Sequence, residues 1–211
     1  MTARLSLLTL LSAALLGGAT SAQAASGIFG TGVVFTTNGS LTLYQSTLLG
    51  DGRHAPQGAS PTVVSSGFDG LDLGTFDPGA GNTLVLNGGG ILTFKNGPDD
   101  VFGGEVFYSI DGAPFASLTT LAFNQDLGSG DQRWYSDGSS VDVLSGLSNG
   151  SPTIAVRYES PFNFGTHQSG APGSVGNNSP TPYQATFEVI PEPSTSLLGA
   201  MAGLVLLRRR R

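Results

Sequence analysis

Cysteine is absent from this 211-residue chain, and positive charge is scarce outside its two ends. Without cysteine there is no disulfide, thiol nucleophile, cysteine-based metal site or lipidated N-terminal cysteine. All acidic residues except Glu192 lie between the two ends, where the cations are Arg53, Lys95, Arg133 and Arg157. Nucleic-acid affinity comes largely from lysine and arginine neutralising phosphates, so this balance argues against DNA or RNA as a partner.

Histidine is nearly as scarce, which limits the chemistry that the chain can support. His54 and His167 each lie in a polar segment, and they lack the short His-x-x-x-His spacing of a zinc site. A serine-rich chain with a histidine can always be arranged into a hypothetical triad, so that arrangement has no predictive value. We assign no catalytic residue and no cofactor from the sequence.

The N-terminus has the three parts of a secretory leader. Arg4 makes the start positive, an apolar stretch follows from Leu5 to Leu16, and Ala22-Gln23-Ala24 is a small-x-small cleavage pattern. This order of positive, apolar and small segments is typical of a signal peptide. We predict a signal peptide over residues 1–24, handled by the Sec translocon and signal peptidase and cleaved after Ala24.

The C-terminus combines a tripeptide, an apolar run and a basic cluster. Pro191-Glu192-Pro193 precedes the uncharged run Leu197–Leu207, and Arg208, Arg209, Arg210 and Arg211 end the chain. The run is shorter than the ~20 residues that span a bilayer as a helix. Four arginines are costly to translocate, however, and their long stems extend the effective span. We predict a membrane helix over 194–207 with a cytoplasmic arginine anchor.

These three parts together resemble the PEP-CTERM sorting signal of Gram-negative bacteria that make exopolysaccharide and biofilm. The resemblance covers the tail over 190–211, together with the leader. It implies recognition at Pro191, Glu192 and Pro193 by exosortase, an integral-membrane enzyme, and cleavage near that tripeptide. The expected route is export, a transient stay in the inner membrane, and then the cell surface or extracellular matrix.

The middle of the chain, residues 25–189, is typical of strands separated by glycine turns. Short apolar runs flank Asn38-Gly39-Ser40, Asn87–Gly90 and Asp111-Gly112, and each arrangement predicts a hairpin. A last strand is expected over Tyr183–Val189, after a long loop over 160–182 that is rich in Pro, Gly, Ser and Asn. The pattern predicts an all-β fold, an antiparallel β-sandwich of jelly-roll type.

Two acidic loops are candidates for a structural calcium ion. Asp126 and Asp131 enclose a Gly-Ser-Gly turn, and Asp99 and Asp100 follow Asn96-Gly97-Pro98. Calcium prefers oxygen ligands from carboxylates, amides and carbonyls. Neither loop matches the EF-hand pattern, and solvated turns are the favoured interpretation.

Aromatic and acidic residues suggest two further candidate sites. Trp134 and Tyr135 are the candidates for stacking on a sugar ring, although a lone tryptophan in a β-domain more often lies in the core. Glu105 and Glu159, both on expected strands, are the candidate carboxylate pair of a glycosidase.

The leading hypothesis is a non-enzymatic surface or matrix protein with a structural or adhesive role, associated with exopolysaccharide. The alternative is a carbohydrate-binding module. A secreted hydrolase is less favoured.

Overall fold

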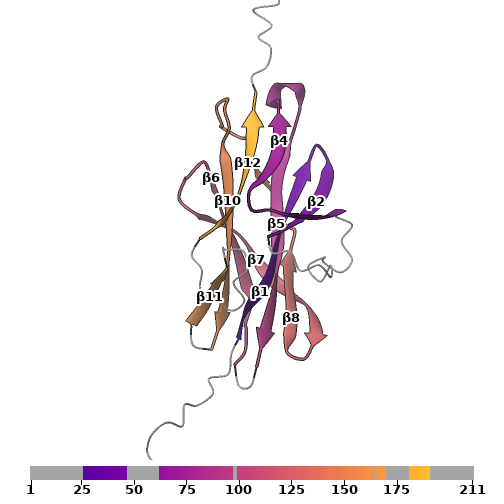
Figure 1. The fold of residues 1–211 in the computed structure, drawn as a ribbon, viewed down its shortest axis with the longest axis vertical. Coiled ribbons are helices and arrows are strands. Elements are labelled where there is room, and N and C mark those ends of the chain that lie inside the picture. Colours follow the sequence, from indigo (N-terminus) through magenta and orange to yellow (C-terminus); the bar gives the residue numbers. More distant parts are fainter. Residues whose placement is uncertain (1–25, 47–61, 97–98, 164, 170–180, 191–211) are drawn as a thin grey trace, which may run out of the picture.

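The computed structural model describes residues 26–46, 62–96, 99–163, 165–169 and 181–190, which form an all-β domain (Figure 1). Within these residues, the short 3₁₀ turn η1 is the sole helical element. The elements in chain order are β1 (Ser26–Thr37), β2 (Ser40–Gln45), β3 (Thr62–Gly67), β4 (Leu71–Phe76), η1 (Pro78–Ala80), β5 (Leu84–Lys95), β6 (Gly104–Ile110), β7 (Ala116–Gly128), β8 (Asp131–Ser136), β9 (Val141–Asp142), β10 (Thr153–Phe162), β11 (Gly165–Ser169) and β12 (Tyr183–Val189).

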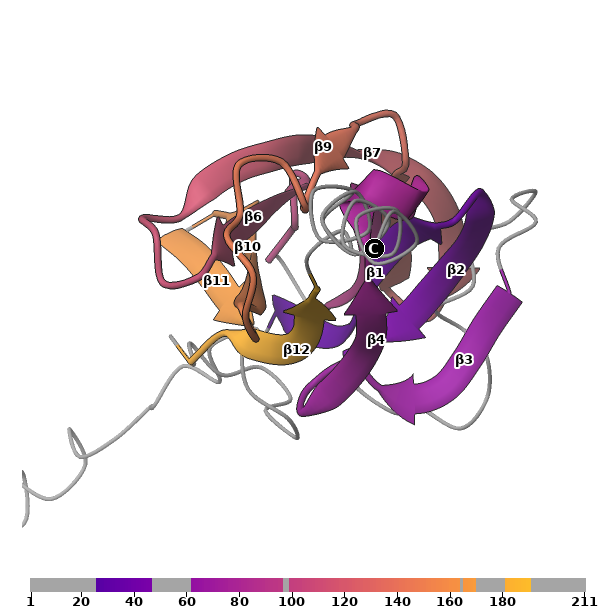
Figure 2. The ribbon, with the colours of Figure 1, turned by 90° about the horizontal axis from the view of Figure 1, so that it is seen from above.

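The strands form one sheet in the order β3-β2-β1-β5-β8-β7-β6-β10-β12-β4, with β9 on β5 and β11 on β10. The two end strands of this path, β3 and β4, are consecutive in the chain. Their short connection is tied to both ends of the sheet, because Phe68 N–H donates to Gln45 O and Gly70 N–H donates to Gln184 O. The sheet therefore curls round until its first and last strands come near each other (Figure 2).

The all-β prediction is confirmed, but the sheet is mixed rather than antiparallel, and the jelly-roll sandwich is not confirmed. Strand β2 pairs with β3 in parallel, and β12 pairs with β4 in parallel. Parallel neighbours need a crossover connection of a dozen or more residues. The long connection from β2 to β3 and the distance in sequence from β4 to β12 both meet this requirement.

The hairpin expected at Asn87–Gly90 is wrong, because β5 runs through these residues without turning. A Cβ atom on Gly88 would lie 2.0 Å from the Ser136 carbonyl oxygen, and one on Gly89 would lie 2.6 Å from the Gly32 carbonyl oxygen. The glycines therefore allow β5 to approach its neighbours β1 and β8 closely. In this strand they mark backbone contact instead of a turn.

The other two predicted turns are confirmed. Asn38 and Gly39 have φ of 49° and 83°, and Asp111 and Gly112 have φ of 50° and 74°. Two consecutive residues with positive φ form the tight hairpin turn that matches strand twist. These turns join β1 to β2 and β6 to β7.

The long loop expected over 160–182 is wrong in its first part. Strand β10 continues to Phe162, and β11 returns over Gly165–Ser169 to pair with it. A predicted last strand over Tyr183–Val189 is confirmed as β12, with every second residue buried. Alternation of this kind is expected for a strand with one face on the core.

The interior is filled by apolar side chains from the whole sheet. Phe35, Phe68 and Tyr44 form one aromatic cluster, with the Phe35 and Phe68 ring centroids 5.8 Å apart. Tyr158 is fully buried beside Tyr183, and its hydroxyl is 3.2 Å from the Ser46 hydroxyl. Burial raises the pKa of Tyr158 above its usual range.

The strand directions define two poles of the domain (Figure 1). At the tail pole, β4 and β12 end at Phe76 and Val189, and η1 follows β4. At the loop pole, β5 ends at Lys95 and β6 begins at Gly104. The β7–β8 turn and the β10–β11 turn also lie at this pole. The antiparallel registers of β5 with β8 and of β6 with β10 bring these loop-pole segments to the same end.

The predicted processing segments lie outside the described residues. These are the cleavage residues Ala22 and Ala24, the tripeptide Pro191–Pro193, the membrane helix over 194–207 and the anchor Arg208–Arg211. Among the residues that are described, no helix reaches the length and apolarity that crossing a bilayer would need.

Candidate functional site

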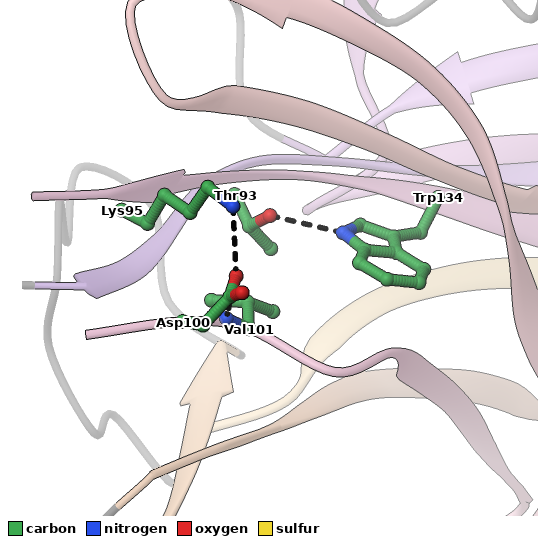
Figure 3. Close-up of polar contacts among 5 residues, drawn as sticks. All are labelled: Thr93, Lys95, Asp100, Val101 and Trp134. Carbon is green, nitrogen blue, oxygen red and sulfur yellow. Dashed lines mark hydrogen bonds and ion pairs between the residues drawn. The ribbon is translucent and has the colours of Figure 1, made fainter. Parts of the chain in front are cut away.

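Trp134 on β8 lies in the core at the loop pole, with 8% of its surface exposed. Its indole Nε1–H donates to Thr93 Oγ1 at 3.0 Å, and Figure 3 shows the indole pointing toward that hydroxyl. Thr93 is itself fully buried on the neighbouring strand β5. The hydrogen bond satisfies the single polar atom of the indole and fixes the ring, as is usual for a buried tryptophan.

Phe123 covers this buried indole from the solvent side. It is the register partner of Trp134 on β7, and the two rings meet edge to face with centroids 5.4 Å apart. Phe123 is 54% exposed, and Phe102, before the start of β6, is 61% exposed. Gly104, the first residue of β6, pairs with Leu121 on β7. Phe102 comes two residues before Gly104 and Phe123 two residues after Leu121, so both lie at the loop pole.

Of the two positions considered for Trp134, the core is confirmed, and its burial speaks against the sugar-stacking role. Burial removes the faces of Trp134 from contact with a ligand, and Tyr135 is half-buried on the other face of β8. Burial and the nearby Asp137 carboxylate raise the pKa of the Tyr135 hydroxyl above its usual range. The exposed phenylalanine rings of the described residues are Phe102, Phe115 and Phe123, and of these Phe102 and Phe123 lie at the loop pole. Their exposure had no recognisable signal in the sequence, because apolar residues are normally expected inside.

In the first predicted calcium loop, the backbone of the turn donates a hydrogen bond to the Asp126 carboxylate. Asp126 is exposed, and its Oδ1 accepts the Gly128 N–H at 2.8 Å. Asp131 begins β8, opposite Gly128 and Phe94. A carboxylate that binds the backbone two residues later is a common turn device. Among the described residues, no group of three or more His, Asp or Glu is arranged to hold a metal ion.

The second acidic loop is different, because one of its carboxylates is buried. Asp99 is 4% exposed, and its Oδ1 has no hydrogen-bond partner. The neighbouring Asp100 is well satisfied: its Oδ1 accepts from Lys95 Nζ at 3.1 Å and from the Val101 N–H at 2.9 Å (Figure 3). Lys95, the cation at this loop, is therefore paired with Asp100.

The carboxylates of the glycosidase hypothesis lie side by side on the outer face of the sheet. Glu105 on β6 and Glu159 on β10 are register partners, which places their Cβ atoms roughly 5 Å apart. Glu105 accepts a hydrogen bond from Ser117, and Glu159 forms an ion pair with Arg157. The Arg157 guanidinium also lies over the ring of Phe107, 4.5 Å from its centroid.

His54 lies outside the described residues, and His167 is the register partner of Ser160 in the β10–β11 pair. The segment Gly146–Gly150 matches the Gly-x-Ser-x-Gly pattern of a nucleophile elbow. It occupies turns between β9 and β10 rather than a strand-to-helix turn, so the context that this motif requires is not met.

At the tail pole the C-terminal strand is held on both sides up to its last residue. Val189 and Gly150 exchange two backbone hydrogen bonds, of 2.8 and 3.0 Å. The next residue, Ile190, donates its N–H to Phe76 O at 2.9 Å. Pro191 begins directly after this clamp.

No family model matches the chain, and no curated protein is significantly similar to it.

Proposed function

We propose that this chain is an exported, non-enzymatic protein of the bacterial cell surface or extracellular matrix, sorted by exosortase. The leader over 1–24 and the tail over 190–211 support export and sorting. The described strands begin at Ser26 and end at Val189, so the β-domain lies in the interval between the two processing segments. In this scheme the domain is the cargo, and the two ends direct its transport.

The clamp on β12 is the observation that carries the proposal. The Ile190 N–H is bound to Phe76 O, and the tripeptide begins one residue later. In sequence, Pro191-Glu192-Pro193 directly follows the last described residue of the domain, so an enzyme at the membrane face would act next to this hydrogen bond. The tail pole would then face the membrane, and the loop pole would face outward toward the exopolysaccharide.

The test is intact-mass analysis of the surface fraction from a producing strain. We expect a species that lacks residues 1–24 and the residues after the tripeptide. Full-length protein in the cytosol would contradict both processing predictions.

A matched pair of variants separates recognition of the tripeptide from general effects of charge. Glu192→Ala removes the acidic residue of the tripeptide, whereas Glu188→Ala removes the acid on β12 that accepts from Thr75 Oγ1. Glu192→Ala should retain the tail and stay in the inner membrane. Glu188→Ala should be processed as in the wild type, and equal processing of both variants would count against exosortase recognition.

Carbohydrate binding at the loop pole is the second candidate function, and the exposure of Phe102 and Phe123 favours it. Rigid aromatic faces are suitable for stacking, and Phe123 is fixed by its contact with Trp134. Phe123→Ala should weaken binding to the strain's exopolysaccharide roughly twofold to twelvefold, corresponding to about 0.5–1.5 kcal/mol for one aromatic contact. Thr120→Ala, on β7 but opposite Glu105, is the control.

A hydrolase is less favoured, although Glu105 and Glu159 are adjacent. A general acid and a nucleophile must each be available to the substrate. Here Glu159 is bound by Arg157, and Glu105 accepts from Ser117. Loss of a glycosidase activity in Glu105→Gln would overturn the non-enzymatic assignment.

A further inference from the structure

Asp99 is the least well satisfied carboxylate that the structure describes. Its side chain is almost fully buried, and Oδ1 makes no hydrogen bond. Transferring an ionised carboxylate out of water is costly unless it is paired, hydrogen-bonded or bound to a metal. A buried polar atom without a partner in a native fold therefore calls for a bound water or ion.

The cation nearest in sequence does not compensate Asp99. Lys95 Nζ lies 3.1 Å from Asp100 Oδ1, and that same oxygen also accepts the Val101 N–H. Asp99 and Asp100 together carry two negative charges against this single lysine. No described basic residue donates a hydrogen bond to Asp99 Oδ1, so the loop keeps one carboxylate charge without a paired cation.

A second acceptor oxygen without a donor lies at the same pole. Gln132 Oε1 is buried and makes no hydrogen bond, and Gln132 pairs with Thr93 two residues before the end of β5. Acceptor oxygens can be satisfied by a donor or by a cation. Carboxylate and amide oxygens, with backbone carbonyls and water, are the ligands that calcium takes in a flexible geometry.

We propose that Asp99 is the anchoring ligand of a calcium ion at the loop pole. Calcium would neutralise the buried charge and would tie the β5–β6 connection to the end of the sheet. The ion belongs to this loop and not to the Asp126–Asp131 turn, whose first carboxylate already binds the Gly128 N–H. The inference does not depend on exosortase sorting, and failure of either leaves the other in place.

The test is thermal unfolding and titration calorimetry of the full chain, purified in mild detergent and freed of metal with EDTA. We expect CaCl2 to raise the melting temperature, with a Kd on the order of 10⁻⁴–10⁻³ M, as in extracellular modules. An unchanged melting temperature at 10-fold higher CaCl2, roughly 10 mM, would overturn the proposal. An equal shift with MgCl2 at the same concentration would overturn the assignment to calcium.

Two variants locate the ion. Asp99→Asn should abolish the calcium response, yet in EDTA it should melt at or above the wild-type temperature, because an uncompensated buried charge has been removed. This pair of results separates loss of a ligand from loss of the fold. Asp126→Asn should keep the full calcium response. A wild-type response in Asp99→Asn, or a lost response in Asp126→Asn, would place the ion elsewhere and overturn the proposal.

Discussion

The tail pole and the loop pole differ in how fully their polar groups are satisfied. At the tail pole, backbone hydrogen bonds hold the chain up to Ile190, and Asp77 Oδ1 caps η1 by accepting the N–H groups of Gly79 and Ala80. At the loop pole, Trp134 binds Thr93 and Lys95 binds Asp100, and the Lys95 N–H donates to Gly130 O. Asp99 is left without a partner for one oxygen.

This difference separates a pole whose chain is held in place from a pole with unfilled bonding capacity. At the tail pole, the hydrogen bonds up to Ile190 make the end of β12 a fixed attachment point. At the loop pole, the exposed rings of Phe102 and Phe123 lie at the same end as the buried oxygens of Asp99 and Gln132 that have no partner. The following predictions measure how strongly each pole, and the core between them, stabilises the fold.

The largest effect is expected from truncating the core side of β12. Phe187 is buried and meets Phe76 edge to face, with ring centroids 6.2 Å apart. Phe187→Ala should lower the free energy of unfolding by about 3–5 kcal/mol, measured by urea denaturation. The exposed neighbour Gln184→Ala should change it by less than about 0.5 kcal/mol. A small loss in Phe187→Ala would mean that β12 is not integral to the fold.

A smaller effect is expected from a glycine pair in the β7–β8 turn. Gly128 and Gly130 have φ of 87° and 91°, but only a Cβ on Gly130 would clash, at 2.3 Å from the Lys95 carbonyl oxygen. Both alanine variants should lose about 1–2 kcal/mol from the left-handed backbone. Gly130→Ala should lose about 1–3 kcal/mol more from overpacking. Equal losses in urea denaturation would show that the turn can move away from β5.

The buried Tyr158 predicts a loss of stability at alkaline pH. Its pKa is raised in the fold, whereas the unfolded tyrosine ionises near pH 10. Below that pH both states bind the proton and the stability is fully present. Above it the unfolded state loses the proton first, so stability falls by about 1.4 kcal/mol per pH unit. Tyr158→Phe should reduce this slope by that amount and leave the pH 7–9 dependence unchanged, as measured by urea denaturation.

The smallest effect is expected at the Trp134–Thr93 hydrogen bond. Thr93→Val keeps the shape of the side chain but leaves the indole N–H buried without an acceptor, which should cost about 1 kcal/mol or somewhat more. In a Trp134→Phe background the same substitution should cost much less, since no donor remains. Additive losses in this double-mutant cycle would show that the hydrogen bond does not fix the indole.

Local signals in the sequence predicted some elements well. Asn38-Gly39 and Asp111-Gly112 form hairpin turns because their backbones tolerate positive φ, and this preference belongs to the residues themselves. The strand expected over Tyr183–Val189 is β12, in which every second residue is buried. By contrast, Asn87–Gly90 also looked like a turn, yet its glycines serve close approach to β1 and β8. That role depends on strands that are distant in sequence.

The candidate site was less predictable, because burial there is a property of the tertiary fold. Asp99 and Asp126 each lie in a glycine-containing acidic loop, and nothing in the sequence says which carboxylate is covered. The sequence likewise gives no sign that Phe123, the register partner of the buried Trp134, is exposed.

Composition, alternation and turn dipeptides alone were enough to predict an all-β domain, since these features act through local backbone preference and hydrophobicity. The parallel pairing of β12 with β4, the clamp at Ile190 and the orphaned oxygen of Asp99 were decided only by the tertiary structure. Each depends on contacts between segments far apart in the chain, whose geometry is set when the sheet curls round on itself.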